Sequence, residues 1–319
     1  MRAFIFPGQG SQAVGMGQAL SDASPVARAV FGEVDEALGQ HLFRTMTEGP
    51  AEDLLLTENA QPAIMANAIA TLRVLEQEGG IRLADKADAV AGHSLGEYTA
   101  LCAADALDLA TTARLLKLRG RAMQAAVPVG EGAMAALLGV DLERARTIAG
   151  AAVDAILAEG GPELVCTVAN DNDPSQVVIS GHRIAIERAV ALAKELGAKR
   201  ALLLPVSAPF HCPLMQPAAD AMDAALAQAD LRAPLVPLYC NVDAVAVADP
   251  GAIRALLVAQ VTGMVRWRES VLAMVDAGVS EFVEFGGKVL APMVKRIAPD
   301  VTATSVVTMD DVEELLKRL

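Results

Sequence analysis

Short apolar runs alternate with longer helical patterns over the first third of the chain. Residues 2–6 form an apolar run that predicts a strand, and residues 60–77 carry apolar side chains at three- and four-residue spacing, which predicts a helix. A second strand, expected at 88–91, leads directly into a helix at 95–104, and a further helix is expected at 107–123. Strands that alternate with helices predict a mainly parallel sheet covered on both faces.

The pattern changes after a probable boundary marked by Pro128, Gly130 and Gly132. A turn rich in Asn, Asp and Pro, from Asn170 to Pro174, is expected to join two short strands. The order of elements is β-α-β-β-α-β, the ferredoxin-like pattern. The elements expected here are strands at 133–138, 164–169, 176–180 and 199–204, and helices at 141–159 and 183–196.

After Pro205 the α/β alternation resumes, with a strand expected at 282–285 and a helix at 288–297. The ferredoxin-like unit therefore resembles an insertion into a larger domain. We predict a catalytic core made of residues 1–127 and 205–319, and an inserted subdomain made of residues 128–204.

Composition limits the class of protein. Hydrophobic residues make up 53% of the 319 residues, but no stretch approaches the roughly 18 uninterrupted apolar residues of a membrane span. The apolar run before Pro7 is also too short for the core of a signal peptide. The four cysteines are scattered without a C-x-x-C pair, which favours reduced thiols over a metal site or disulfides. We therefore expect a cytoplasmic protein.

The net charge of −13 argues against binding to nucleic acid or to a membrane surface. An acidic partner would need a local basic patch, because the overall field of the protein repels it. Six basic residues are candidates for such a patch, although each fits a scattered, solvated charge equally well: Lys194, Lys199, Arg200, Lys288, Lys295 and Arg296.

The sequence G-H-S-L-G at 92–96 lies between a predicted strand and a predicted helix. A G-x-S-x-G turn in that position presents the serine hydroxyl, here that of Ser94, at the top of the sheet. The helix that follows offers backbone N–H groups to a developing oxyanion. We interpret Ser94 as a nucleophile that carries an acyl ester; the alternative is a structural turn in which the serine only caps the helix.

A serine nucleophile needs a base, and the chain has four histidines. His41 lies in a polar connector, His182 opens a helix of the inserted unit, and His93 adjoins the serine in a turn where neighbouring side chains diverge. His211 remains, in a proline-bracketed loop at the point where the main domain resumes. By elimination we predict His211 as the base, against the alternative of a structural histidine.

Two further features fit a ligand site. The loop F-P-G-Q-G-S-Q at 6–12 follows the first strand, and its glycines let backbone approach a ligand, although a flexible strand exit explains it too. Arg119 interrupts an otherwise apolar helix. It is either a surface arginine with a buried stem or a fork for a substrate carboxylate.

Together these residues resemble the malonyl-CoA:acyl carrier protein transacylases, the acyltransferase family of fatty acid and polyketide synthesis. The motifs that carry the resemblance occur in the family's order: F-P-G-Q-G-S-Q at 6–12, G-H-S-L-G-E at 92–97, L-R-G at 118–120, V-V-I-S-G at 177–181 and P-F-H-C at 209–212. The resemblance implies an α/β-hydrolase-like core with a ferredoxin-like insert.

The resemblance also implies roles. Ser94 would attack a malonyl thioester while His211 removes its proton, and the main-chain carbonyl of Gln260 would orient the histidine in place of a carboxylate. Backbone N–H groups of Gln9 and Leu95 would form the oxyanion hole. A substrate-binding set would comprise Arg119, which clasps the free carboxylate of malonyl, with Gln260, His93, Phe210 and Asn170.

Phe210 matches the malonyl-selective form of its loop, in which a bulky ring crowds an α-methyl branch. The implied reaction moves malonyl from malonyl-CoA to the phosphopantetheine thiol of holo acyl carrier protein, by a ping-pong route that supplies extender units for fatty acid synthesis. We expect a monomer that needs no metal and no cofactor. The alternatives are a discrete acyltransferase of a polyketide pathway, a serine esterase or thioesterase, and a catalytically silent scaffold module.

Overall fold

A computed structural model describes the whole chain, residues 1–319, and shows two β-sheets. The larger sheet has six strands in the order β10-β9-β1-β2-β7-β8, and every neighbouring pair is parallel except β7 and β8. Its strands are β1 (Arg2–Phe6), β2 (Ala89–Gly92), β7 (Leu238–Tyr239), β8 (Ala246–Val247), β9 (Glu281–Phe285) and β10 (Thr302–Val306). The predicted mixed α/β class with a mainly parallel sheet is confirmed.

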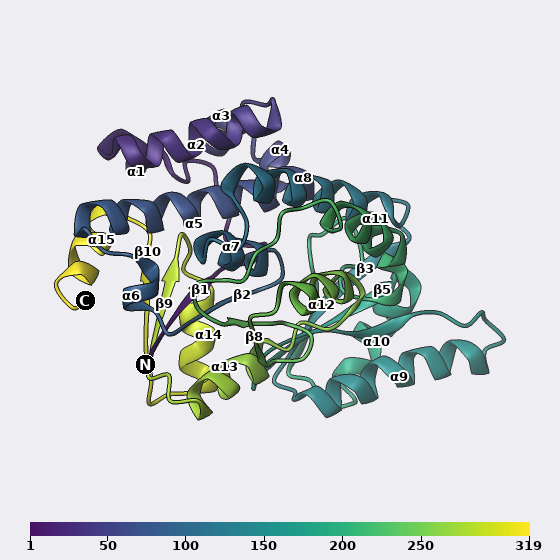
Figure 1. Ribbon diagram of the computed structural model, residues 1–319. Helices are drawn as coiled ribbons and strands as arrows, with labels where there is room; N and C mark the ends of the chain where they lie inside the picture. Colours follow the sequence, from purple (N-terminus) through teal and green to yellow (C-terminus); the bar gives the residue numbers. More distant parts are fainter.

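Both faces of this sheet are buried, which explains the continuous apolar run of β1. Phe4 and Phe6 pack into the cluster beneath helices α5 (Thr57–Gly79) and α7 (Leu95–Ala103). Ala3 and Ile5 pack on the opposite face, which helices α13 (Trp267–Asp276) and α14 (Leu290–Ile297) cover. Figure 1 shows α5, α7 and α8 on one side of the sheet with α1 to α4 as a further layer outside them. No helix combines the length and the apolar character that crossing a membrane requires.

The helices outside the smaller sheet have the following bounds: α1 (Gln18–Ala23), α2 (Pro25–Leu38), α3 (Leu42–Glu48), α4 (Ala51–Leu55), α5 (Thr57–Gly79), α6 (Leu83–Lys86), α7 (Leu95–Ala103), α8 (Leu109–Ala125), the 3-10 turn η1 (Pro213–Met215), α11 (Gln216–Leu226), α12 (Pro250–Thr262), α13 (Trp267–Asp276), α14 (Leu290–Ile297) and α15 (Met309–Leu316).

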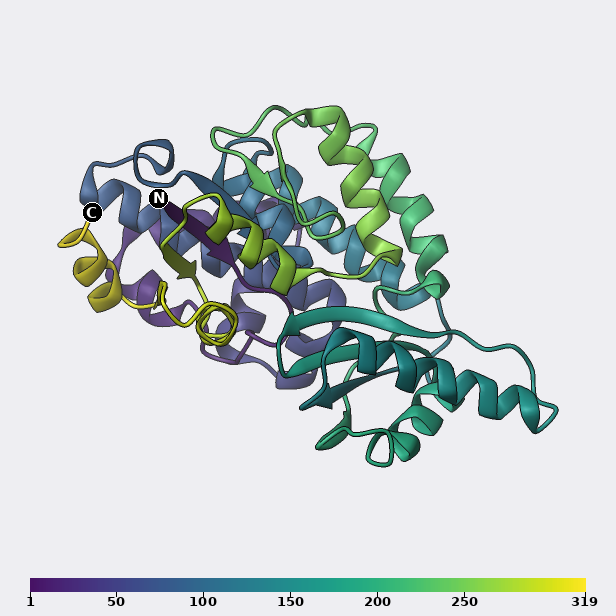
Figure 2. The same ribbon diagram turned by 90° about the horizontal axis from the view of Figure 1, so that it is seen from below.

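The smaller sheet is antiparallel, in the order β4-β5-β3-β6. Alternate residues of β3 separate its two faces: Ala135 and Leu137 pack under α9 and α10, while Met134 and Ala136 face the main body. This sheet and its helices form one end of the molecule (Figure 2). Its elements are β3 (Gly132–Leu138), α9 (Leu142–Ala158), β4 (Cys166–Asp173), β5 (Gln176–His182), α10 (Arg183–Ala193) and β6 (Arg200–Leu203).

The prediction of a turn from Asn170 to Pro174 is wrong in its extent. Strand β4 continues through Asp173, and the turn comprises only Pro174 and Ser175. Asn and Asp favour turns because their side chains can bond to nearby backbone. Here the carboxylate of Asp171 is instead bound by a distant arginine, so tertiary contacts override the local preference.

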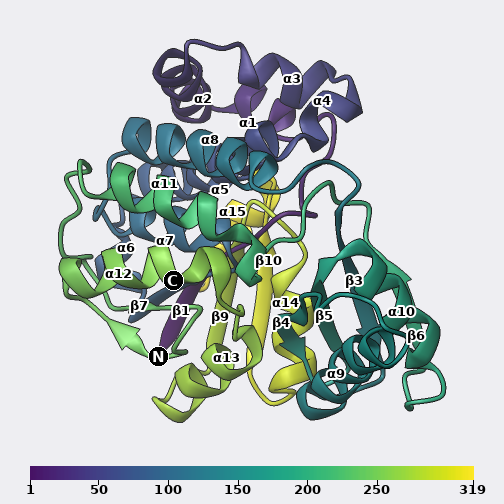
Figure 3. The same cartoon turned by 90° about the vertical axis from the view of Figure 1, so that its right-hand side faces the viewer.

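β4 also joins the smaller sheet to the main body along one seam. The N–H of Asp171 donates to the carbonyl of Val265 (2.9 Å), and the N–H of Val265 donates to the carbonyl of Ala169 (2.8 Å). Two ion pairs flank this bridge, Arg268 Nη2 to Asp171 Oδ2 and Arg296 Nε to Asp173 Oδ2, both at 2.8 Å. The view in Figure 3 shows β4 beside α13 and α14, which supply these arginines.

Candidate active site

Ser94 occupies a sharp turn between β2 and α7, with φ 54° and ψ −109°. Left-handed φ is rare for a residue with a side chain and marks local strain. The glycines on either side are sterically required: a Cβ on Gly92 would lie 1.9 Å from the carbonyl carbon of Gly96, and one on Gly96 would lie 2.2 Å from the carbonyl oxygen of Phe6. The turn therefore has the construction that the G-x-S-x-G pattern predicts.

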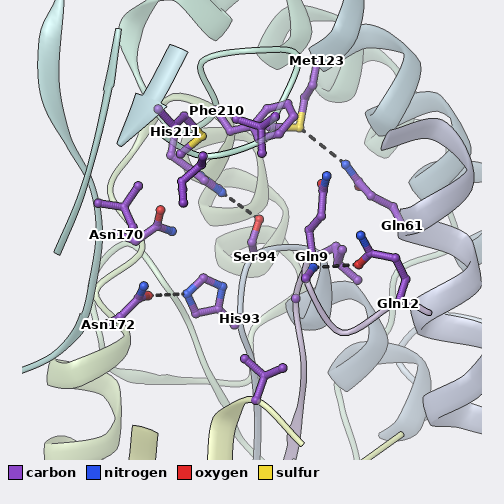
Figure 4. Close-up of a pocket in the computed structure, with 18 of the residues that line it drawn as sticks. Gln9, Gln12, Gln61, His93, Ser94, Met123, Asn170, Asn172, Phe210 and His211 are labelled. Carbon is purple, nitrogen blue, oxygen red and sulfur yellow. Dashed lines mark hydrogen bonds between the residues drawn. The ribbon is translucent and has the colours of Figure 1, made fainter. Parts of the chain in front are cut away.

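The serine hydroxyl faces a histidine, as drawn in Figure 4. Ser94 Oγ lies 2.7 Å from His211 Nε2, and His211 Nδ1 lies 2.9 Å from the carbonyl oxygen of Gln260. A carbonyl only accepts, so Nδ1 must carry the proton and Nε2 is left free to accept from the serine hydroxyl. Burial, and then the positive charge of Arg119, lower the pKa of His211 to about 3, so the ring is neutral at neutral pH.

Arg119 of α8 is only 1% exposed, which excludes the surface alternative. Its Nη1 donates to Gln61 Oε1 (2.9 Å), and its Nη2 donates to Gln260 Oε1 (2.8 Å) and to Ser94 Oγ (3.1 Å). Its Nε is buried without a partner, and burial lowers the pKa of the guanidinium. No carboxylate pairs with Arg119, so a buried cation lies beside the serine with only neutral hydrogen-bonding partners.

A cavity of about 450 Å³ opens above these residues, between the two sheets. Every residue of the predicted site lines it except Gln260, which lies behind Arg119 and His211. Apolar side chains of α8, β3, β5, α14 and the segment after β6 also line the cavity: Met123, Met134, Val178, Met293, Leu204 and Val206. It lies beyond the carboxyl ends of β1 and β2, which is where ligands bind in open parallel sheets.

The Gln9 loop approaches the serine turn closely from β1. A Cβ on Gly8 would lie 2.7 Å from the carbonyl oxygen of His93, so glycine is required at this contact. Gln9 and Leu95 both line the cavity, and Figure 4 shows Gln9 near Ser94. The loop is therefore packed against the elbow by a specific close approach, which the flexible-loop alternative does not account for.

Strand β4 contributes two amides to the cavity, Asn170 and Asn172. His93 Nε2 lies 2.8 Å from Asn172 Oδ1, so His93 turns away from the base and contacts the smaller sheet instead (Figure 4). The family resemblance included Asn170. Asn172 was missed, because it lies in the segment that was expected to be a turn.

Three other polar residues of the site were also missed: Gln61, Glu97 and Asn241. Asn241 Oδ1 accepts from the N–H of Ser94 (2.7 Å), and Glu97 accepts from Gln260 Nε2 (2.9 Å). Burial raises the pKa of Glu97 to about 7, although hydrogen bonds from Gln260 and Asn241 and the charge of Arg119 oppose that rise. The only sequence signal was the place of Glu97 in the motif at 92–97.

Of the six basic candidates for a partner-binding patch, Arg296 is paired with the buried Asp173, and Lys295 donates to the carbonyl of Val301. The other four are exposed and form no ion pair: Lys194, Lys199, Arg200 and Lys288. No group of three or more His, Cys, Asp or Glu side chains is placed to hold a metal ion.

The sequence matches the family model described as the acyl transferase domain over residues 3–295. The chain belongs to the acyl transferase family. A relative from Escherichia coli, named malonyl CoA-acyl carrier protein transacylase, is 47% identical over 305 residues, which is 95% of this chain and 94% of that protein. One of the same name from Bacillus subtilis is 41% identical over 99% of this chain and 96% of its own length.

Solved structures of the acyl transferase family have the same fold. The acyl-carrier-protein S-malonyltransferase of Bartonella henselae superposes with a TM-score of 0.94 at 51% identity, covering 99% of this chain and 98% of that one. A malonyl-transacylase in complex with a type II polyketide acyl-carrier protein gives a TM-score of 0.93 at 39% identity, covering 100% and 99%. The resemblance found in the sequence motifs is therefore confirmed.

Proposed function

We propose that this acyl transferase moves a malonyl group from malonyl-CoA to the phosphopantetheine thiol of a holo acyl carrier protein, and so supplies extender units for fatty acid synthesis. The observation that carries the proposal is Arg119, a guanidinium 1% exposed and 3.1 Å from the serine hydroxyl, with no carboxylate partner. A buried charge is costly when unpaired, so the site favours a substrate that brings its own carboxylate. Malonyl-CoA has that carboxylate and acetyl-CoA lacks it.

In the first half-reaction, Ser94 Oγ attacks the thioester carbonyl while His211 Nε2 takes the hydroxyl proton. The tetrahedral intermediate collapses, the carbon–sulfur bond breaks, and the histidine returns the proton to the departing thiol of coenzyme A. Backbone N–H groups of Gln9 and Leu95 would stabilise the oxyanion, each by about 3–4 kcal/mol. In the second half-reaction the carrier thiol attacks the malonyl-Ser94 ester by the same steps in reverse, which is a ping-pong mechanism.

Arg119 also links substrate choice to base strength. Its positive charge helps to lower the pKa of His211 to about 3. A malonyl carboxylate bound to the guanidinium would cancel part of that charge and raise the pKa of the histidine toward a useful range. An acyl group without a carboxylate would leave the histidine a weaker base.

The remaining residues would shape the cavity. Phe210 is 7% exposed and lies beside the base, where its ring would crowd an α-methyl branch. One methyl group is worth about 1–3 kcal/mol of discrimination. Asn170 would line the acyl cavity from the smaller sheet, and His93 would tie that sheet to the serine turn through Asn172.

We further propose that residues 1–127 and 205–319 form an α/β-hydrolase-like core and that residues 128–204 form a ferredoxin-like insert. The strand order β4-β5-β3-β6, with helices α9 and α10 on one face, supports the second description. The parallel order around β1 and the elbow after β2 support the first.

The proposed partners are malonyl-CoA and holo acyl carrier protein. The exposed cations Lys194, Lys199, Arg200 and Lys288 are the candidates for contact with an acidic carrier. A cytoplasmic location is supported by four buried cysteines, none of which forms a disulfide. A monomeric state and independence from metals and cofactors stay predictions.

Incubation with [¹⁴C]malonyl-CoA tests the function. We expect a label on the wild-type protein that passes to holo- but not apo-carrier, and no label on Ser94→Ala, because the variant has no hydroxyl to form the ester. If the label instead leaves the protein as free malonate, at the same rate and without reaching the carrier, the protein is a thioesterase and not a transferase.

A polyketide carrier is the second candidate acceptor, because the related malonyl-transacylase in complex with a type II polyketide carrier is 39% identical over the full chain. Transfer rates to a panel of fatty acid and polyketide carriers at equal concentration would distinguish the two. The preferred acceptor is the one with the higher kcat/KM.

A further inference from the structure

The backbone of the nucleophile is held by two side-chain amides from distant parts of the chain. The N–H of Ser94 donates to Asn241 Oδ1 (2.7 Å), and the carbonyl of Ser94 accepts from Gln260 Nε2 (3.0 Å). Asn241 Nδ2 also donates to the carbonyl of Gly92 (2.7 Å), so one amide spans the turn. The strained φ of 54° at Ser94 is thus stabilised by contacts from outside the turn.

Both amide residues contact one carboxylate oxygen. Glu97 Oε2 accepts from the backbone N–H of Asn241 (3.0 Å) and from Gln260 Nε2 (2.9 Å). The three residues are at most 1% exposed, so water does not compete for these bonds. Glu97 Oε1 has no partner, so Oε2 remains an acceptor whether or not Oε1 carries a proton.

A side-chain amide has one donor end and one acceptor end, which makes the contact with Glu97 directional. The Gln260 NH2 group faces three acceptors: Glu97 Oε2, the Ser94 carbonyl and, at 3.4 Å, Asn241 Oδ1. Its Oε1 faces Arg119 Nη2 at 2.8 Å. The reversed amide would place oxygen against oxygen at one end and N–H against guanidinium at the other. Glu97 thereby helps the Ser94 carbonyl and Asn241 Oδ1 to determine which end of Gln260 meets Arg119.

The amide also keeps the two charges apart. Arg119 and Glu97 are both buried, yet Gln260 lies between them and no ion pair joins them. A direct pair would neutralise the guanidinium and leave little reason for it to bind an incoming carboxylate. With Gln260 between them, Arg119 is fixed in place and remains without an anion.

We propose that Glu97 is a positioning residue for the transfer reaction. Through Asn241 and Gln260 it holds the Ser94 turn in its reactive shape, and through Gln260 it presents Arg119 to the substrate carboxylate. This inference rests on the proposed malonyl transfer. It assigns to Glu97 no contact with the substrate itself.

Glu97→Met tests the role, because methionine has a similar size and shape but no oxygen acceptor. We expect kcat/KM for malonyl-CoA to fall by about 10- to 100-fold, since two buried N–H groups lose their acceptor. The fall for acetyl-CoA should be smaller, which lowers the malonyl/acetyl preference about tenfold. Glu97→Gln retains one oxygen acceptor and should keep that preference within about threefold of the wild type.

Modification of Ser94 by phenylmethylsulfonyl fluoride gives a readout that does not depend on malonyl. The modification should slow in Glu97→Met, because the serine turn loses support. Glu284→Gln is the matched control: Glu284 is also a fully buried carboxylate, but its partners are the N–H groups of residues 289–291 and Ser305 Oγ. It should lower stability and leave the malonyl/acetyl preference unchanged.

If Glu97→Met does not fold, the double variant Glu97→Gln with Gln260→Glu tests the proposal instead. It swaps the two side chains, so the composition and the number of buried charges stay the same. It moves the carboxylate directly onto Arg119, and malonyl transfer should fall about 100-fold with a smaller change for acetyl. The proposal is overturned if folded Glu97→Met keeps wild-type rates and preference, or if the exchanged protein keeps its malonyl preference. A wild-type protein that never forms malonyl-Ser94 would instead overturn the proposed function.

Discussion

Asp171 and Asp173 of β4 are buried carboxylates that are each paired with an arginine of the larger sheet's helices, whereas Arg119 at the cavity is a buried arginine paired with none. The two aspartate side chains are 1% and 0% exposed, and each ion pair measures 2.8 Å. Arg119 is just as buried but is bound by two glutamine amides and a serine hydroxyl.

The difference separates structural charges from one that awaits a ligand. Removing a charge from water costs several kcal/mol, and a close partner offsets much of that cost. The complete pairs at Asp171 and Asp173 join the smaller sheet to α13 and α14 and so hold the two sides of the cavity together. The incomplete one at Arg119 faces the cavity, where the substrate would supply the missing anion.

Arg119→Ala should produce the largest effect. We expect kcat/KM for malonyl transfer to fall about 10²- to 10³-fold, because a charge pair in a desolvated site is worth about 3–4 kcal/mol. Acetyl transfer should stay similar or improve, since no carboxylate is involved. Single-turnover labelling with both acyl-CoAs measures the two rates, and equal losses for both would show that Arg119 is structural.

Arg268→Met should weaken the seam between the sheets. Asp171 has no other ion partner, and we expect a loss of about 1–3 kcal/mol in the free energy of unfolding, below the value for a fully buried pair because water reaches Arg268. Urea unfolding at neutral pH measures the loss. The double variant Arg268→Met with Asp171→Asn should recover most of it, and failure to recover would mean that the arginine stem, not the charge, is what matters.

The pH dependence of Ser94 modification tests the charge of Arg119 in another way. Since the pKa of His211 is lowered to about 3, the histidine remains a free base as pH falls, and the rate of sulfonyl fluoride modification should hold down to about pH 5. Arg119→Met removes a positive charge, so the pKa of His211 should rise. The fall in modification rate at acid pH, the acid limb of the pH profile, should then begin at a higher pH. Arg119→Lys keeps the charge and serves as the control. An unmoved limb in Arg119→Met would leave burial as the only cause.

Arg296→Met should have the smallest effect. Asp173 keeps bonds from the N–H of Ser175 (2.8 Å) and its Oγ (2.9 Å), and the arginine side chain is 47% exposed. We expect a loss of about 0.5–1 kcal/mol in unfolding free energy by urea titration. Arg82→Ala breaks a surface pair with Asp85 and should give no measurable change. A loss at Arg296 as large as that at Arg268 would contradict the ranking by exposure.

The parts of the fold that could be predicted from the sequence have regular, long or two-sided apolar patterns. Strand β1 is buried on both faces and α5 spans several turns, so their periodicity is clear. Helices α1, α3 and α4 have only six, seven and five residues, too few to show a helical period, and they were not predicted. Helix α2 was not predicted either, although its 14 residues are enough to show one.

The site divides in the same way. Ser94, His211 and Arg119 lie in motifs whose local sequence restricts their role, and the structure brings all three together. Asn241 and the side chain of Gln260 have no such signal, because their importance comes from loops and helices that meet only in the folded chain. The strand through Asn172 was missed because the partners that overrule its turn residues lie about 100 positions away.

The seam at β4 has a consequence for engineering this enzyme. A chimera that exchanges residues 128–204 with those of another acyl transferase would replace Asp171 and Asp173 while leaving Arg268, Arg296 and Val265 in the host. The grafted β4 would then meet host partners at Arg268, Arg296 and Val265 that were not selected together with it. A transplant of residues 128–204 should therefore also include α13 and α14 from the same donor. The two segments are separate in the sequence but form one structural unit.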